Sequence, residues 1–238
     1  LLPAWLSESG LELKSIGLFA LIQFPFTWKF IWAPLFDRFS FSMGRRRGWL
    51  IIFQVLLLIS IAIAGFLSPT SQITIVALIS IIIAFFSASQ DVVIDAYRRE
   101  LLLDHELGLG NAIHVNAYKI ASLIPGSLSL ILADIFAWDL VFLITALFML
   151  PGIVLTLLIK EPQLKTLPPR TVKEAVVEPF KEFKNRKGLK EALLILLFIF
   201  LYKIGDSMAT ALATPFYLEL GFSMTEIGVI AKNAGLWP

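Results

Sequence analysis

Long apolar runs separated by short polar segments form the main pattern of the chain. A membrane-spanning helix needs about 20 mostly apolar residues. By this measure the pattern predicts spans at residues 15–36, 49–67, 73–97, 108–133, 139–159 and 189–214, with the start of another from about residue 225. Residues 1–6 are typical of the end of an earlier span, and the sequence stops within an apparent helix. We therefore expect a fragment of an all-α integral membrane protein.

The composition supports a membrane protein over a soluble one. The 238 residues are 58% hydrophobic and 16% charged, whereas soluble domains average about 45–50% and about 25%. The mean hydropathy of +0.82 agrees with this assignment. The lipid bilayer is therefore an expected partner of the chain, and we expect no nucleic-acid partner.

Basic residues predict how the spans are oriented. Most of the 20 lysines and arginines lie in segments 37–48, 98–107 and 160–190, whereas the loops between the other spans contain only Lys14. Loops that face the cytoplasm carry an excess of lysine and arginine. The three basic segments are therefore predicted to be cytoplasmic.

The last of these segments also suggests the domain organisation. Residues 160–188 are polar, basic and contain proline, which predicts a cytoplasmic linker between a transmembrane bundle at 1–159, with an incomplete first span, and the start of a second bundle at 189–238. Apolar residues from Val172 to Phe183 have helical spacing. A short amphipathic helix on the membrane surface and a solvated loop broken by Pro179 are both compatible with this pattern.

The chain offers little for covalent or metal chemistry. It has no cysteine, and its two histidines, His105 and His114, do not have the spacing of a metal-ligand pair on a helix. We found no nucleophile-elbow or phosphate-binding motif. We therefore expect no catalytic residues, no metal, no cofactor and no enzyme activity.

The third predicted span, by contrast, carries ionisable residues. On a helix Ser87, Asp91, Asp95 and Arg98 fall on one narrow stripe. A charge near the bilayer centre costs at least about 2.5–3.5 kcal/mol, so such residues usually face a wet cavity and indicate a path for a substrate or for protons. The stripe therefore suggests a transport function.

A charged loop joins the first two complete spans. Asp37 and Arg38 end one span, and Arg45, Arg46 and Arg47 precede the next. These arginines could serve topology alone. Alternatively, together with Arg98, they could close a cytoplasmic gate through charge-assisted hydrogen bonds.

This loop resembles the corresponding loop of major facilitator transporters. With residues 28–38 (WKFIWAPLFDR), 85–96 (FFSASQDVVIDA) and 201–207 (LYKIGDS), the chain resembles the muropeptide permease (AmpG) family of the major facilitator superfamily, which is related to acetyl-CoA transporters. The resemblance implies a helical bundle of two pseudo-symmetric halves. It also implies proton-coupled import of N-acetylglucosaminyl-1,6-anhydro-N-acetylmuramic acid, with or without its peptide, by alternating access across the bacterial inner membrane for peptidoglycan recycling.

Such coupling needs a carboxylate that is protonated when desolvated and ionised when a cation approaches. The candidates are Asp91, Asp95 and Asp206. Asp95 is one turn from Arg98, so a structural ion pair is an alternative role. Asp91 has no basic residue three or four positions away and is the preferred proton carrier. Asp206 follows Lys203 by three residues, and the two could pair or contact the substrate.

A polar cargo needs cations and hydrogen-bonding groups inside the bundle. Lysines lie within three predicted spans, and uncharged polar residues lie near them. Trp28 and Trp32 flank Lys29, where sugar stacking and plain packing are both possible. Trp5, Trp49 and Trp138, at span ends, are predicted membrane-interface anchors. The candidate substrate-binding residues are Gln23, Trp28, Lys29, Trp32, Asn116, Lys119, Tyr202 and Lys203.

Other functions remain open at this point. A transporter of the same fold could carry acetyl-CoA or another organic anion, although the dispersed lysines do not favour a cargo with three phosphates. A channel or a non-transporting membrane sensor is a further alternative, which the acids inside the spans do not favour. The expected partners are therefore a small anhydro-muropeptide, protons and the bilayer.

Overall fold

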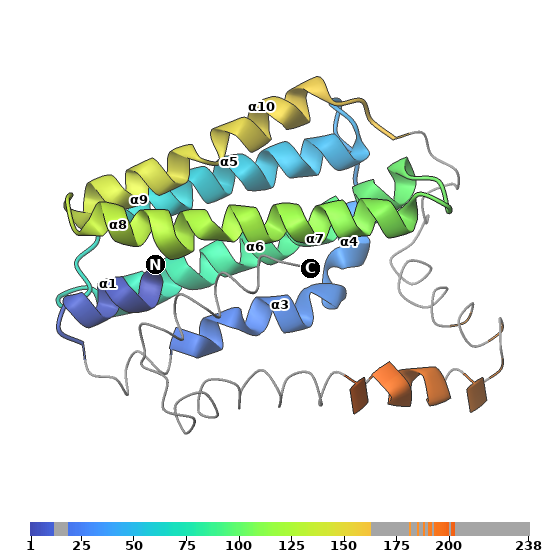
Figure 1. Cartoon of the computed structure of the whole chain (residues 1–238), viewed down its shortest axis with the longest axis horizontal. Helices are drawn as coiled ribbons and strands as arrows, with labels where there is room; N and C mark the ends of the chain where they lie inside the picture. Colours follow the sequence, from blue (N-terminus) through green and yellow to red (C-terminus); the bar gives the residue numbers. More distant parts are fainter. Residues whose placement is uncertain are drawn as a thin grey trace. The chain divides into compact units, whose positions relative to one another are not determined.

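The computed structural model describes residues 1–11 and 19–162, together with short helical pieces between 181 and 202. The chain divides into two compact units, Leu1–Val172 and Lys173–Pro238. The described part of the first unit is helical, with one isolated bridge at Phe41 and Gly44 (Figure 1). The division between the units falls within the predicted linker. The domain boundaries themselves remain a prediction.

Four helical rods in the described residues are long and apolar enough to cross a membrane. They confirm the spans predicted at 49–67, 73–97, 108–133 and 139–159. The rods consist of α5 (Arg45–Gly65), α6 (Ile73–Leu101), α7 (Leu107–Leu123) with η3 (Ile124–Leu128) and α8 (Ser129–Ala133), and α9 (Trp138–Leu147) with α10 (Leu150–Leu158).

Prolines explain the irregularities in two of these rods. Pro125 lies at the start of η3, a π-helical turn. A proline inside a helix has no N–H for the bond to the preceding turn, which explains why the α-helical hydrogen bonding is interrupted there. Pro151 lies in the first turn of α10, where its missing N–H costs least, and α9 ends just before it.

The segment predicted as a spanning helix at 15–36 is not one continuous helix. From residue 19 it consists of η1 (Phe19–Gln23), α3 (Phe24–Trp28), η2 (Lys29–Ile31) and α4 (Ala33–Arg38). Pro25 and Pro34 each lie in the first turn of an α-helical piece. The prediction overlooked that each proline interrupts the hydrogen bonds of a helix that would otherwise run through it.

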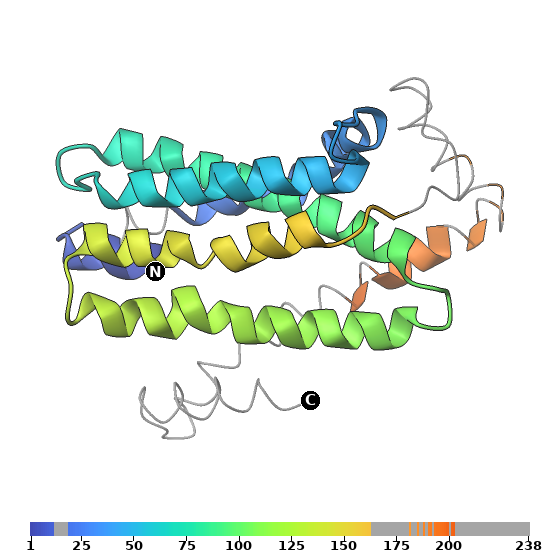
Figure 2. The same ribbon diagram turned by 90° about the horizontal axis from the view of Figure 1, so that it is seen from above.

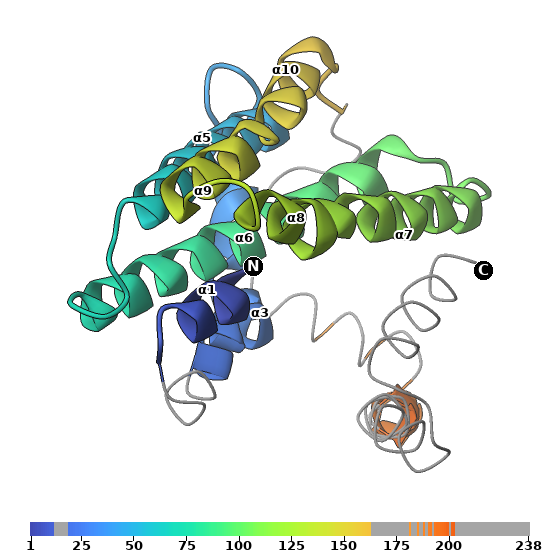
Figure 3. The ribbon, with the colours of Figure 1, turned by 60° about the vertical axis from the view of Figure 1, so that its left-hand side comes forward.

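Helix α5 lies at the centre of the described packing. It contacts α6 on one side and α9 and α10 on the other (Figures 1 and 2). Gly65 permits the close approach to α9, since a Cβ atom there would lie 2.6 Å from Phe142 Cβ. The pieces α3 and α4 pack against α6. The rod of α7 and α8 is the least buried of the four, with 6% of its most apolar stretch buried (Figure 3).

One predicted interface anchor is instead part of the core. Trp5 of α1 (Leu2–Glu8) is only 2% exposed and packs its ring edge-on against Phe142 at 4.8 Å between centroids. Its neighbours in this core include Leu6, Ala64 and Val76. The anchor prediction for Trp5 is therefore wrong, because α1 packs its middle residues, Trp5 and Leu6, onto the core. Trp49 and Trp138 are partly exposed, and their anchoring role remains a prediction.

Candidate transport site and gate

The central feature of the described part is an ion pair between two elements. Lys29, the first residue of η2, donates a hydrogen bond from Nζ to Oδ2 of Asp91 on α6. The two side chains are 31% and 40% exposed. Because an isolated charge within a span is costly, each group neutralises the other. The sequence indicated both residues as candidates, but it did not predict that they are partners.

A second bond joins Trp32, the residue between η2 and α4, to α6 near the pair. Trp32 Nε1 donates to Ser89 Oγ at 3.0 Å, and Ser89 is fully buried. The Trp32 ring also lies 5.0 Å from the ring of Phe85, measured between centroids. The indole of Trp32 is therefore held at both its polar and its apolar edge. Sequence reasoning did not single out Ser89, although it lies two residues before Asp91.

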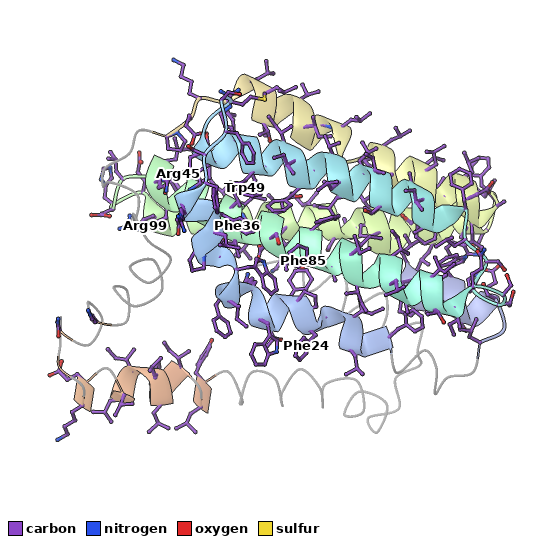
Figure 4. The ribbon with its side chains drawn as sticks, turned by 180° about the vertical axis from the view of Figure 1, so that it is seen from behind. Phe24, Phe36, Arg45, Trp49, Phe85 and Arg99 are labelled. Carbon is purple, nitrogen blue, oxygen red and sulfur yellow. The ribbon has the colours of Figure 1, made fainter. Side chains whose placement is uncertain are left out.

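An apolar groove lies between α3 and α6 beside these contacts. Its volume is about 450 Å³, within the range of about 300–1,000 Å³ typical of small-molecule sites. Figure 4 shows Phe24 on α3 and Phe85 on the neighbouring helix α6. Trp28 stacks on Phe24 with 5.3 Å between ring centroids and is 40% exposed. The groove is lined by Phe24, Pro25, Trp28, Ile31, Trp32, Ile81, Ile82, Phe85 and Phe86.

The remaining candidates for substrate binding are not joined to this pair. Asn116 on α7 donates its amide to the carbonyl of Ala112 on the same helix at 2.9 Å. In the part of the chain that the structure describes, neither Asn116 nor Lys119 forms a hydrogen bond or ion pair with Lys29 or Asp91. Gln23 is exposed at the end of η1.

Three candidates belong to the second unit. Tyr202 is 68% exposed and stacks on Phe198 with 6.3 Å between ring centroids. Lys203 and Asp206 lie outside the described residues. Lys29 and Asp91 form an ion pair, and Trp28 and Trp32 line the groove, whereas a cavity shared by all the candidates stays a prediction.

The second acid on α6 has the partner that its spacing predicts. Arg98 Nη2 donates to Asp95 Oδ1 at 2.8 Å on the same helix. Their side chains are 25% and 47% exposed, respectively. Asp95 thus has a structural partner within α6, whereas Asp91 is paired across elements.

A cluster of charges holds three elements together at one end of the first unit. Arg46 is only 4% exposed, and its Nη2 donates at 2.6 Å both to Asp37 Oδ1 and to Glu100 Oε1. Arg45 Nη2 also donates to Glu100 Oε1 at 2.6 Å. We call Asp37, Arg45, Arg46 and Glu100 the charge cluster. Its two cations and two carboxylates balance in charge and tie α4, α5 and α6 together.

A neighbouring carboxylate links this end to α10. Glu161 accepts hydrogen bonds from the backbone N–H groups of Arg46 and Arg47 at 2.7 and 3.0 Å. In return, Arg47 donates from Nε and Nη2 to the carbonyls of Thr156 and Leu157 at 3.0 and 2.7 Å. The first N–H groups of α5 and the last carbonyls of α10 lack partners within their own helices. Arg47 of α5 therefore caps α10, and Glu161, three residues beyond α10, caps α5.

Three predicted gating residues lie outside the charge cluster, and one of them, Arg47, binds carbonyls of α10, as described above. Arg38 is exposed and places its guanidinium 5.5 Å from the centroid of the Phe39 ring. Arg98 pairs with Asp95, as described above. Conversely, Glu100 and Glu161 were missed. Glu100 directly follows Arg98 and Arg99, and its position one residue after two cations was the available signal.

The described parts of the three segments predicted to be cytoplasmic, residues 37–48, 98–107 and 160–162, lie at this same end. The end of α4, the start of α5, the end of α6 and the end of α10 lie together in Figures 1 and 2, whereas the α5–α6 and α8–α9 loops lie at the opposite end. The contacts of the charge cluster and of Glu161 agree with this arrangement.

Among the described residues no group of three or more metal-ligating side chains occurs.

These features define a helical protein with four candidate membrane-spanning rods in its described part and charged groups within and at the ends of them. The sequence profile of the Major Facilitator Superfamily matches residues 1–236, and the chain belongs to this superfamily. Its members are membrane transporters, and the chain is accordingly a multi-pass membrane protein and not an enzyme.

Individual relatives confirm the resemblance to muropeptide permeases. The chain is 43% identical over 239 residues to the anhydromuropeptide permease of Escherichia coli K12, covering 99% of this chain and 48% of that protein. It is 36% identical over 250 residues to a putative transporter AmpG 3 of Rickettsia prowazekii, covering 98% and 58%. An uncharacterized protein of Haemophilus influenzae is 51% identical over 242 residues, covering 100% and 56%. The chain thus spans about half the length of these relatives.

Proposed function

We propose that the protein containing this chain imports anhydro-muropeptides across the bacterial inner membrane, driven by the proton gradient. The cargo is N-acetylglucosaminyl-1,6-anhydro-N-acetylmuramic acid, with or without its peptide, and the import serves peptidoglycan recycling. The observation that carries the proposal is the ion pair of Lys29 and Asp91. The names of the relatives supply the cargo class.

Asp91 is the proton carrier in this proposal. A nearby cation favours the ionised carboxylate, whereas loss of the cation in a poorly solvated place favours the protonated form. When Lys29 moves away, Asp91 takes up a proton, and when Lys29 returns, the proton leaves. The pair is neutral when Asp91 is ionised and carries one positive charge when Asp91 is protonated, so a negatively charged group of the cargo beside Lys29 would restore the balance.

The groove beside the pair suits the sugar part of the cargo. Small-molecule sites are mostly apolar, with a few polar groups that fix the orientation of the ligand. Trp28 offers a partly exposed ring for stacking, while the hydrogen bond to Ser89 fixes the ring of Trp32. The apolar faces of the sugar rings would lie on these side chains, and Lys29 would contact a charged group.

The charge cluster is the proposed cytoplasmic gate. Its bonds hold the ends of α4, α5 and α6 together, and Glu161 adds α10. Charge-assisted hydrogen bonds of this kind are strong but can be exchanged for water. In alternating access by rocking of the two halves, the cluster would stabilise one of the two conformations.

Uptake into vesicles tests the proposal. Right-side-out membrane vesicles or proteoliposomes that contain the whole protein receive labelled anhydro-disaccharide, with and without an imposed proton gradient. We expect accumulation only with the gradient. Accumulation that ignores the gradient would remove proton coupling, and uptake of acetyl-CoA instead of the disaccharide would favour the other cargo class.

A further inference from the structure

We propose that Lys29 recognises the cargo by binding one of its carboxylates. This carboxylate and the ionised side chain of Asp91 compete for the ammonium group of Lys29, so only one of them binds at a time. The inference rests on the proposed function and specifies its substrate class. It predicts that the negative charge of the cargo, in addition to its sugar rings, is required for transport.

The charges around the pair support this exchange. On the elements that pack against α6, the other ionisable side chains are already engaged: Arg45, Arg46 and Asp37 lie in the charge cluster, Arg47 binds carbonyls of α10, and Arg38 lies over Phe39. The described residues of η1 and α3 contain no ionisable side chain. On α6 itself, Asp95 is bound to Arg98.

Lys29 directly follows Trp28, which lines the groove, and it is the one cation in η1, α3 and η2 as the structure describes them. All residues that line the groove are apolar or aromatic, so they offer a negatively charged group no ionic partner. A carboxylate of the cargo that enters the groove would find its counter-ion only at Lys29.

Charge balance explains why the cargo carboxylate and ionised Asp91 do not bind Lys29 at the same time. A cargo carboxylate and an ionised Asp91 together would place two negative charges on one ammonium group, which is costly in a poorly solvated site. If Asp91 first takes a proton from water, the carboxylate replaces it without a change in net charge. Lys29 keeps its protons throughout, and the bond formed and later broken is the O–H bond of Asp91. One proton accompanies each carboxylate.

The proposed cargo meets this requirement. Without its peptide, the disaccharide carries the lactyl carboxylate of the muramic acid, and with the peptide it carries the carboxylates of the peptide. A methyl ester of the lactyl group removes the charge and preserves the sugar rings. The acid and the ester of the peptide-free disaccharide are therefore a matched pair of probes.

The test measures binding and gradient-driven uptake of both probes by the whole protein. For the native protein we expect the acid to bind at least about tenfold more tightly than the ester. A ratio of this size corresponds to the free energy of one charge-assisted contact. In Asp91→Asn the acid should bind more tightly than it does to the native protein, because no carboxylate of the protein competes for Lys29.

Variants of the lysine complete the test. Lys29→Gln should bind acid and ester equally. The double variant Lys29→Gln/Asp91→Asn should do the same, and it should insert normally because it leaves no unpaired charge. Lys160→Gln, at an exposed lysine outside the groove, is the matched control and should preserve the preference for the acid. Equal, gradient-driven uptake of acid and ester by the native protein would overturn the inference and leave the proposed function intact. If neither probe is taken up, both fail.

Discussion

Lys29 and Asp91 are 62 residues apart in the chain, and their side chains form an ion pair between η2 and α6. Both elements belong to spans predicted from the sequence. A broken helix carries the lysine and a long continuous helix carries the aspartate. A small movement of η2 relative to α6 would thus separate the charges without disturbing the packing of α5 against α6.

Asp91→Asn should abolish concentrative uptake of anhydro-muropeptide while membrane insertion remains normal. An amide cannot cycle between charged and neutral forms, so the proton gradient no longer drives the cargo. Asp104→Asn is the control, because Asp104 forms an exposed pair with Arg99. The measurement is steady-state accumulation in vesicles relative to the amount of inserted protein. Normal accumulation would transfer the proton-carrying role to Asp95 or Asp206.

Arg46→Ala should lower the free energy of unfolding by about 3 kcal/mol or more, because it leaves Asp37 and Glu100 without their best-buried cation. Arg99→Ala, at an exposed ion pair, should cost no more than about 1 kcal/mol. Thermal unfolding of the purified protein in detergent measures both. Equal losses for the two variants would contradict a structural role for the charge cluster.

The same arginine should control access from the cytoplasm. This chain contains no cysteine, so Ser87→Cys adds one label site on the stripe that carries Asp91, and any cysteine elsewhere in the whole protein is replaced by serine. We expect Arg46→Ala to raise the rate at which a membrane-impermeant thiol reagent labels this cysteine from the cytoplasmic side. An unchanged rate, with normal labelling after the protein is unfolded, would argue that the cluster serves topology alone.

Gly44→Ala should destabilise the protein by about 1–3 kcal/mol. Gly44 has a φ of 114°, and a Cβ atom there would lie 2.4 Å from Glu161 Oε2. The substitution therefore strains the backbone and displaces the carboxylate that caps α5. Gly108→Ala is the control, since its Cβ atom would meet nothing within 4 Å, and replacing a helical glycine tends to stabilise by up to about 1 kcal/mol. Thermal unfolding distinguishes the two.

Trp28→Ala should weaken binding of the disaccharide by about tenfold, through loss of the exposed ring of the groove. Trp32→Phe should have a smaller effect, because it preserves a ring and removes only the hydrogen bond to Ser89. Phe66→Ala, at an exposed aromatic residue outside the groove, should not alter binding. Equilibrium binding of labelled disaccharide measures all three, and unchanged binding by Trp28→Ala would argue for plain packing.

The spans with regular apolar patterns could be predicted from the sequence. Residues 73–97 and 139–159 have the length and hydropathy of a membrane helix, and each corresponds to a rod in the structure. The pair of Asp95 and Arg98 was also predictable, because a spacing of three places both side chains on one side of a helix. Local patterns were sufficient in these cases.

Contacts between distant segments could not be predicted in this way. Nothing in the local sequence of Lys29 indicates that it meets Asp91, because the pairing depends on how η2 packs against α6. Glu161 was assigned to a linker, although it caps α5. The inward position of Trp5 similarly depends on its contact with Phe142.

The most direct test of the account is whether cargo carries protons through Asp91. Proteoliposomes with a pH-sensitive dye inside receive anhydro-disaccharide from outside, with no gradient imposed, and the internal pH is followed. The account predicts that cargo acidifies the interior for the native protein and leaves it unchanged for Asp91→Asn. Equal acidification by both proteins would contradict the assignment of proton coupling to the pair of Lys29 and Asp91.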